Sequence, residues 1–191
     1  MRRPIAILSV TTLLALAGTG YSSQDDRKAA RAECIASLSG FPDGDTAVKT
    51  SIPADTNGFT LKYFASGCFG TCPAFTLTFS EGVARFEGHD YVRAKGRRTA
   101  KLTQSEFEEF LHAWYDGRFY AMRDDYCTPT CPDGTHILVT DIPGSSITLV
   151  APNFTKQVFE CYLAAETPTP PEQYFELKRK ILEFAKAHRW L

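Results

Sequence analysis

Six cysteines constrain the folding of this 191-residue chain more than any other feature. Four of them form two Cys-x-x-x-Cys-Pro motifs, "CFGTCP" at residues 68–73 and "CTPTCP" at residues 127–132, and the other two are Cys34 and Cys161. An even number of cysteines favours disulfides over free thiols if the chain is in an oxidising compartment. The spacing alone does not choose among the possible pairings.

The first 22 residues predict export. Arg2 and Arg3 precede a short apolar run from Ile5 to Ala17, and small residues place the cleavage site near residues 17–22. This is the anatomy of a secretory signal peptide, and the run is shorter than the about 20 apolar residues of a spanning helix. Thr19 stands where a lipoprotein would carry its lipidated cysteine. We therefore predict a periplasmic or secreted protein, with no transmembrane segment in the mature chain.

Composition is that of one ordinary globular domain, with 43% apolar and 23% charged residues. The net charge of -1 becomes about -3 once the two signal arginines are removed. This balance excludes nucleic acid as a partner, and the densest basic stretch, residues 93–98, is interpreted as a solvated face. The predicted partner is an unknown protein or small-molecule ligand, and the chain is expected to be a monomer.

Three segments carry helical patterns. Residues 22–38 place Ala30, Cys34 and Leu38 on one stripe, so Cys34 should face the body of the protein. The segment after Leu102 begins with a capping box of Thr103 and Glu106. The last helix is expected to have residues 169 and 172 as its capping box, with a buried stripe that ends at residue 184.

Alternating apolar and polar residues predict strands between and beyond these helices. The expected strands are residues 59–66, 75–80, 83–88, 91–95, 135–142 and 146–150, with a turn at Pro143 and Gly144. Together the patterns predict an α+β fold, a mostly antiparallel sheet of about five to seven strands with two or three helices packed on one side. Residues 23–44 are expected to form an N-terminal helix and linker, and residues 45–191 a single domain.

The cysteine motifs are the one place where chemistry could lie, because the sequence shows no hydrolase, phosphate-loop or zinc-protease motif. A Cys-x-x-x-Cys-Pro motif resembles the start of the site of exported, thioredoxin-like copper chaperones, in which two thiolates and a distant histidine bind copper. Here those ligands would be Cys68, Cys72 and His136. The context differs, since that family's motif leads into a helix, whereas the residues after Cys72 read as a strand.

In the structural interpretation, the cysteines of the two motifs form disulfides instead of binding a metal. A Cys68–Cys72 bridge would pin a tight loop in which Gly70 supplies backbone freedom, and Pro73 can start the next strand. Cys127 and Cys131 could close their own loop in the same way. Cys34 and Cys161 would then be left to pair, and would hold the first helix to the region before the last one. A further alternative pairs the two loops with each other.

The run "GCFGTCPAFTLTFSEGVARFEG", the "LTQSEFEEFL" helix, "RFYAMRDDY" and the terminal "RWL" resemble a bacterial family of exported, uncharacterised domains, domain of unknown function 6438. The resemblance covers residues 59–191. It implies export and no assigned activity. The hallmark of the family, C-F-G-T-C-P followed by an aromatic strand, falls on Cys68, Phe69, Gly70, Thr71, Cys72, Pro73 and Phe75.

These observations favour a non-catalytic binding or envelope-associated module, exported and stabilised by disulfides, with no cofactor. The alternative is a thiol-redox or copper-binding protein that uses the Cys-x-x-x-Cys-Pro motifs.

Overall fold

The computed structural model describes residues 24–42, 53, 56–80, 82–137, 142–161 and 167–191. Within them the chain is an α+β protein, as predicted, with a six-stranded antiparallel sheet. The elements are α1 (Gln24–Leu38), β1 (Thr60–Ala65), β2 (Ala74–Ser80), β3 (Val83–Asp90), β4 (Gly96–Lys101), α2 (Gln104–Asp116), the 3-10 helix η1 (Phe119–Ala121), β5 (Gly144–Ala151), β6 (Phe154–Cys161) and α3 (Glu172–Ala187). The predicted signal segment lies outside the described residues.

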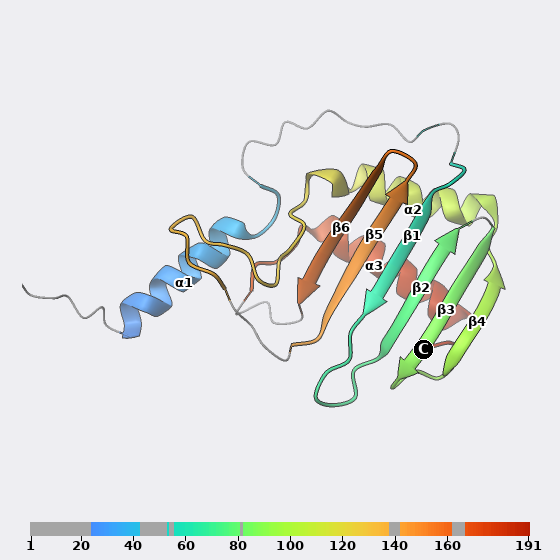
Figure 1. Cartoon of the computed structure of the whole chain (residues 1–191), viewed down its shortest axis with the longest axis horizontal. Helices are drawn as coiled ribbons and strands as arrows, with labels where there is room; N and C mark the ends of the chain where they lie inside the picture. The colour runs from blue at the N-terminus through green and yellow to red at the C-terminus, as the bar shows by residue number, and fades with distance from the viewer. Residues whose placement is uncertain (1–23, 43–52, 54–55, 81, 138–141, 162–166) are drawn as a thin grey trace, which may run out of the picture.

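The sheet has the strand order β4-β3-β2-β1-β5-β6. Strands β1 to β4 form a meander, α2 then carries the chain back, and the β5–β6 hairpin extends the sheet beyond β1. The register places Leu61 between Phe79 and Leu149 on one face, while the next residue of β1, Lys62, lies on the other. Helices α2 and α3 cover the first face, and no described element covers the second (Figure 1).

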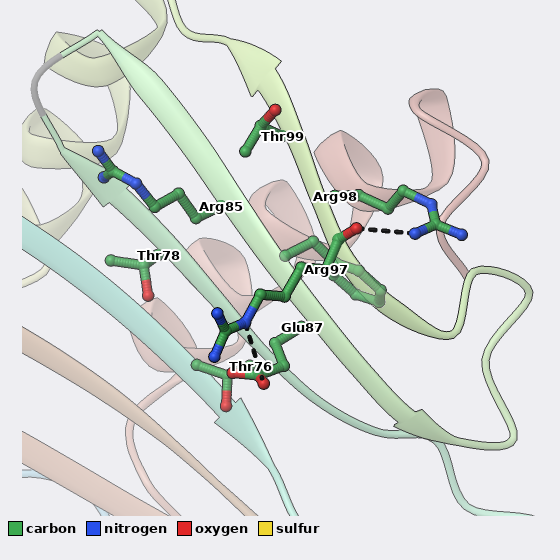
Figure 2. A pocket seen from close by; sticks show the side chains of 8 residues that line it. Thr76, Thr78, Arg85, Glu87, Arg97, Arg98 and Thr99 are labelled. Atoms are coloured by element: carbon green, nitrogen blue, oxygen red, sulfur yellow. Dashed lines mark hydrogen bonds and ion pairs between the residues drawn. The ribbon is translucent and has the colours of Figure 1, made fainter.

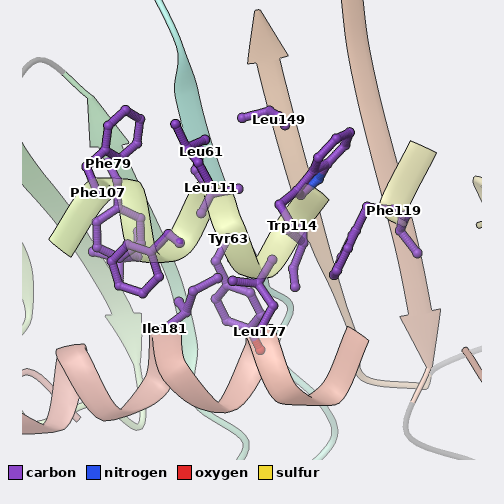
Figure 3. Packing of buried hydrophobic residues seen from close by; sticks show 14 of the residues in the cluster. Leu61, Tyr63, Phe79, Phe107, Leu111, Trp114, Phe119, Leu149, Leu177 and Ile181 are labelled. Carbon is purple, nitrogen blue, oxygen red and sulfur yellow. The ribbon is translucent and has the colours of Figure 1, made fainter. Parts of the chain in front are cut away.

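The core lies between the sheet and this helical layer (Figure 3). Aromatic and branched side chains of β1, β2 and β5 meet the stripe of α2 that contains Leu111 and Trp114 and the stripe of α3 that contains Leu177 and Ile181. All four of these helix side chains are almost fully buried. At roughly 1.5–3 kcal/mol for each large apolar side chain, this layer is the main source of stability.

Helix α2 begins where the local sequence predicts. The side chain of Thr103 accepts a hydrogen bond from the Glu106 backbone N–H (3.2 Å), and the Glu106 carboxylate accepts from the Thr103 backbone N–H (2.8 Å). The hydrogen bonds from the Thr103 side chain and backbone lower the pKa of Glu106. The capping box therefore forms from residues that lie next to each other in the chain, without help from the rest of the fold.

Helix α1 lies beside the β6 side of the sheet rather than on the helical layer (Figure 1). Its end is held by three contacts. The Arg123 side chain donates to the Leu38 carbonyl (3.1 Å), the Tyr126 hydroxyl donates to the Gly40 carbonyl (2.7 Å), and the Gly40 N–H donates to the Thr169 carbonyl (2.8 Å). The division into residues 23–44 and 45–191 remains a prediction. Within the described chain no helix is both long and apolar enough to cross a membrane.

Three local predictions were wrong, one strand was missed, and one expected strand lies partly outside the described residues. Residues 91–95 form a bend rather than a strand, and the edge strand is β4, which follows them. Strand β6 was not predicted, and Gly144 pairs with Cys161 inside the sheet instead of turning. Helix α3 starts after Pro171, with no side-chain cap, so residues 169 and 172 form no capping box. Of the strand expected at residues 135–142, positions 138–141 lie outside the described residues, and His136 forms only an isolated bridge.

Candidate functional site

The open face of the sheet presents side chains in cross-strand rows. One row runs across all six strands as Thr99, Arg85, Thr78, Lys62, Thr148 and Gln157. The neighbouring row is Arg97, Glu87, Thr76, Phe64, Ser146 and Phe159. Because successive residues of a strand point to opposite faces, these two rows, polar except for Phe64 and Phe159, are the complement of the buried core rows. The face is rich in hydroxyl groups and carries more cations than carboxylates.

A depression of about 290 Å³ lies at the β2–β3–β4 side of this face. It is lined by Thr76, Thr78, Arg85, Phe86, Glu87, Arg97, Arg98 and Thr99. Figure 2 shows Arg97 extending over the strands toward Glu87 and Thr76, with Thr78 between it and Arg85. Two guanidinium groups therefore stand on either side of a floor of threonine hydroxyls.

Neighbouring side chains hold these arginines without using all their donors. The Arg97 Nε lies 3.6 Å from the Glu87 carboxylate, and an Arg85 Nη donates to the Ser80 hydroxyl (2.8 Å). A guanidinium has five N–H groups, so each can still bind an anionic or carbonyl oxygen. The lining residues offer hydroxyls, guanidinium groups and one carboxylate, Glu87, so the depression presents both hydrogen-bond donors and acceptors to a polar group.

The hallmark loop lies at one end of this face, between β1 and β2. Cys68 and Cys72 form a disulfide with a Cα–Cα distance of 5.5 Å, which confirms the predicted tight bridge. Gly70 has a φ of 154° and its N–H donates to the Cys68 carbonyl (2.9 Å), so this position needs the freedom of glycine. Phe69, held within the ring, is 88% exposed. The disulfide thus fixes the position of an aromatic side chain that projects into solvent.

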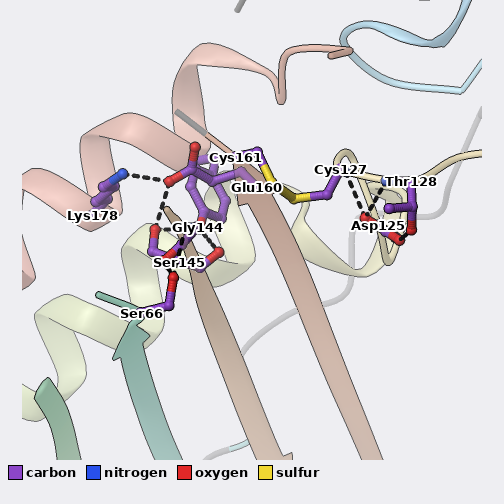
Figure 4. Close-up of a disulfide and its surroundings, with 10 residues drawn as sticks. Ser66, Asp125, Cys127, Thr128, Gly144, Ser145, Glu160, Cys161 and Lys178 are labelled. Atoms are coloured by element: carbon purple, nitrogen blue, oxygen red, sulfur yellow. Dashed lines mark hydrogen bonds and ion pairs between the residues drawn. A yellow bond between two sulfur atoms is a disulfide. The ribbon is translucent and has the colours of Figure 1, made fainter. Parts of the chain in front are cut away.

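The other four cysteines pair differently from the structural interpretation of the sequence. Cys34 is bonded to Cys131, and Cys127 to Cys161 (Figure 4). The predicted Cys127–Cys131 and Cys34–Cys161 bridges, and the pairing of the two loops with each other, are therefore wrong. Within the described chain no cysteine is free.

Backbone contacts explain the observed pairing. The Tyr126 N–H donates to the Phe159 carbonyl and the Phe159 N–H donates to the Asp124 carbonyl, both at 2.9 Å, so the chain runs along the end of β6 and brings Cys127 to Cys161. The Cys131 N–H then donates to the Thr135 carbonyl (2.7 Å). The reversal at Cys131 turns that residue toward the buried face of α1, where Cys34 lies.

The copper ligands considered above are not brought together. The sulfurs of Cys68 and Cys72 are bonded to each other, and His136 accepts from or donates to the Thr130 hydroxyl through Nδ1 at 3.0 Å. His136 lies by α1, in a second depression of about 410 Å³ that also contains Arg27 and Arg31. In the part of the chain that the structure describes, no three histidine, cysteine or carboxylate residues are grouped as a metal site would require.

A buried polar cluster lies near the Cys127–Cys161 bridge (Figure 4). Lys178 forms an ion pair with the Glu160 carboxylate (2.5 Å), and the same carboxylate accepts from the Ser145 hydroxyl (2.6 Å). The Tyr174 hydroxyl donates to the Ser145 carbonyl (3.2 Å). Although serine, lysine and carboxylate can form a catalytic group, Ser145 is 0% exposed, so no substrate can reach it. This cluster anchors α3 to β5 and β6.

Part of the open sheet face could be predicted from the sequence. The alternation of Thr76 and Thr78 with buried neighbours indicated the polar face, but not which strands would lie beside it. Strand β6 was missed because two of its inward positions, Lys156 and Glu160, are charged, which hides the apolar alternation. The depression depends on β4, which was also missed as a strand.

Comparison with protein families matches residues 59–183 to the family described as domain of unknown function (DUF6438). The match covers more than half of the chain, so the chain belongs to this family. It includes the whole sheet and the Cys68–Cys72 loop, while α1 precedes it. A search of curated proteins found no match.

Proposed function

We propose that this chain is an exported, non-catalytic binding module, and that the open sheet face is its ligand-binding surface. The observation that carries the proposal is the depression of about 290 Å³ between Arg85 and Arg97, floored by threonine hydroxyls. Guanidinium groups bind carboxylates and phosphates, and hydroxyls donate to or accept from neutral polar groups. The ligand class that fits is a hydroxylated small molecule with a carboxylate or phosphate group.

Export is supported by the apolar N-terminal segment behind two arginines and by the three disulfides, which persist in oxidising compartments. The absence of catalysis is supported by the site itself. The one carboxylate in the depression, Glu87, is next to Arg97, and the serine–lysine–carboxylate cluster is sealed in the interior. The binding surface, in contrast, lies on rigid paired strands, which hold a site more accurately than loops do.

The test is a ligand screen on the oxidised mature protein with uronic acids and sugar phosphates as probes, read by amide chemical shifts. We expect shifts confined to β2, β3 and β4, and their loss in an Arg85→Ala/Arg97→Ala variant. A Lys28→Ala/Lys180→Ala variant is the matched control, because it removes two exposed cations elsewhere. Shifts that map to another surface, or that persist at full size in the arginine variant, would contradict the proposal.

The second candidate is thiol-redox or copper work at Cys68 and Cys72, favoured by the small and accessible disulfide ring. A thiol count and a redox titration of the purified protein separate the two. Thiols at Cys68 and Cys72 that reoxidise at a measurable midpoint potential would show that this bridge is more than structural. No thiols in the native protein, together with no spectral or mass change on adding Cu(I) under mild reduction, would remove the copper candidate.

A further inference from the structure

Two connections project from the same end of the sheet. Strands β1 to β4 form an antiparallel meander, so the β1–β2 and β3–β4 connections lie at one end and the β2–β3 connection at the other (Figure 1). We call residues 67–73 and 90–95 together the loop end. It contains the hallmark disulfide and the bend that sequence patterns had predicted to be a strand.

Each connection of the loop end displays an exposed aromatic side chain. Phe69 is 88% exposed and Tyr91 is 58% exposed. At the opposite end of the sheet, the exposed apolar side chains are Val150, on the open face, and Phe154, beside Trp114 on the helical side, each 40% exposed. Phe69 and Tyr91 are both more exposed than these side chains, and covering them with another surface would remove apolar area from water.

Both aromatic side chains stand on backbone that is held in place. The disulfide and Gly70 determine the path at Phe69, as described above. Tyr91 has a φ of 50°, a left-handed conformation that a large non-glycine residue adopts only when its surroundings impose it.

The surroundings that hold Tyr91 are backbone contacts. The Ala94 N–H donates to the Trp190 carbonyl at 3.0 Å, which ties the bend to the C-terminal residues. A Cβ atom on Gly88 would lie 2.2 Å from the Ala94 carbonyl oxygen, so the bend packs directly against β3. Val92 and Ala94 also pack against the core, while Arg93 between them is exposed. The bend is therefore rigid rather than loose.

Charge is distributed unevenly between this region and the rest of the chain. Residues 90–98, the β3–β4 bend and the start of β4, contain four lysines and arginines and one carboxylate, a net charge of +3, so the other 182 residues together carry -4. Arg93 and Lys95 follow Tyr91 in the bend, and of these two cations only Lys95 is in a described ion pair, with Asp90 at 3.2 Å. The loop end thus combines protruding rings with a local excess of positive charge.

We infer that the loop end docks on an anionic lipid surface, with Phe69 and Tyr91 in the interfacial region and the cations near the headgroups. Aromatic side chains favour the membrane–water interface, and cations near an anionic leaflet strengthen binding. Protein partners bury hot-spot aromatics in formed pockets, whereas separate convex tips such as these fit a fluid surface. The inference rests on the proposed export, but it needs no ligand in the sheet depression.

Vesicle sedimentation of the oxidised mature protein tests this inference. Vesicles of one part phosphatidylglycerol to two parts phosphatidylcholine should bind the protein, and vesicles of phosphatidylcholine alone should bind it less. Arg93→Ala/Lys95→Ala should weaken binding about 25-fold, at about fivefold for each cation. Phe69→Ala should weaken it by about tenfold or more. Salt at about 1 M, where the Debye length is about 3 Å, should reduce the difference in protein binding between the two kinds of vesicle.

Matched controls and a second readout keep the result independent of folding. Phe154→Ala removes an aromatic side chain at the opposite end of the sheet, and Lys28→Ala/Lys180→Ala makes the same charge change away from the loop end. Both should bind vesicles like the wild type. Phe69→Trp should show a blue-shifted emission on anionic vesicles, since Trp114 and Trp190 are already buried.

Three results would overturn the inference. The first is no binding to either kind of vesicle. In that case a cross-linker at position 69 would show whether a second copy, another protein or nothing covers Phe69. The second is an equal loss of binding in the control variants. The third is an unchanged tryptophan emission in vesicle-bound Phe69→Trp. None of these depends on whether small anions bind between Arg85 and Arg97, so this inference and the proposed sheet-face site can fail separately.

Discussion

The Cys127–Cys161 bridge leads to a quantitative prediction. Replacing both cysteines by alanine should lower the free energy of unfolding by about 4 kcal/mol. The bridge spans a sequence separation of 34 residues, and the chain-entropy relation for a loop of this length corresponds to about 4 kcal/mol at 25 °C. The same relation for the Cys68–Cys72 ring, with a separation of 4 residues, corresponds to only about 2 kcal/mol.

The difference between these two values is what the experiment measures. Urea unfolding of the oxidised variants, followed by circular dichroism and tryptophan fluorescence, yields the two free energies by linear extrapolation. Cys68→Ala/Cys72→Ala is the matched control, because it also removes one disulfide and two sulfurs. A loss of about 4 kcal/mol is a large share of the 5–15 kcal/mol typical of a domain. Equal losses in the two variants would refute the argument from loop length.

Peptide mapping tests the pairing itself. Complete tryptic cleavage without reduction should leave residues 124–156, which contain Cys127 and Cys131, joined to both 32–49 and 157–178. The pairing first expected from the sequence would instead leave 124–156 unlinked and join 32–49 to 157–178. Recovery of that simpler pattern would show that the arrangement around β6 is wrong.

Three further predictions concern individual residues. Lys178→Met should cost about 3–5 kcal/mol in urea unfolding because it leaves the Glu160 carboxylate buried without its cation, and Glu160→Leu/Lys178→Met should lose less. Gly88→Ala should cost about 1–3 kcal/mol, since its Cβ would meet the backbone of the β3–β4 bend; an unchanged melting temperature would contradict that packing. The hydrogen bonds from Thr103 lower the folded pKa of Glu106. The ionised carboxylate therefore contributes to the free energy of unfolding above its ordinary pKa of 4.5, and this contribution is lost as pH falls through the folded pKa. When the free energy of unfolding is measured as a function of pH, the acid-dependent loss due to Glu106 should therefore be missing in Glu106→Gln.

Local interactions explain what could be predicted from the sequence. The capping box of α2 depends on residues three positions apart, and the alternation in β1 and β2 depends on neighbours two positions apart. The tight Cys68–Cys72 bridge likewise joins residues of one short loop. In each case the groups that interact are close in the chain, so the sequence pattern contains both partners.

The tertiary structure decided the rest, because the deciding partners are distant in sequence. Cys34 meets Cys131 across a separation of 97 residues, and that contact depends on the path of the chain along β6. Strand β6 itself carries two inward charges, and each has a distant partner: the Glu160 carboxylate pairs with Lys178 of α3, and Lys156 donates to the Met122 carbonyl (2.6 Å). The bend at Tyr91 similarly depends on the C-terminal Trp190. By itself, the sequence determined the helical and alternating segments and the presence of disulfides. Long-range packing determined which cysteines meet, which face stays open and which aromatic side chains project from it.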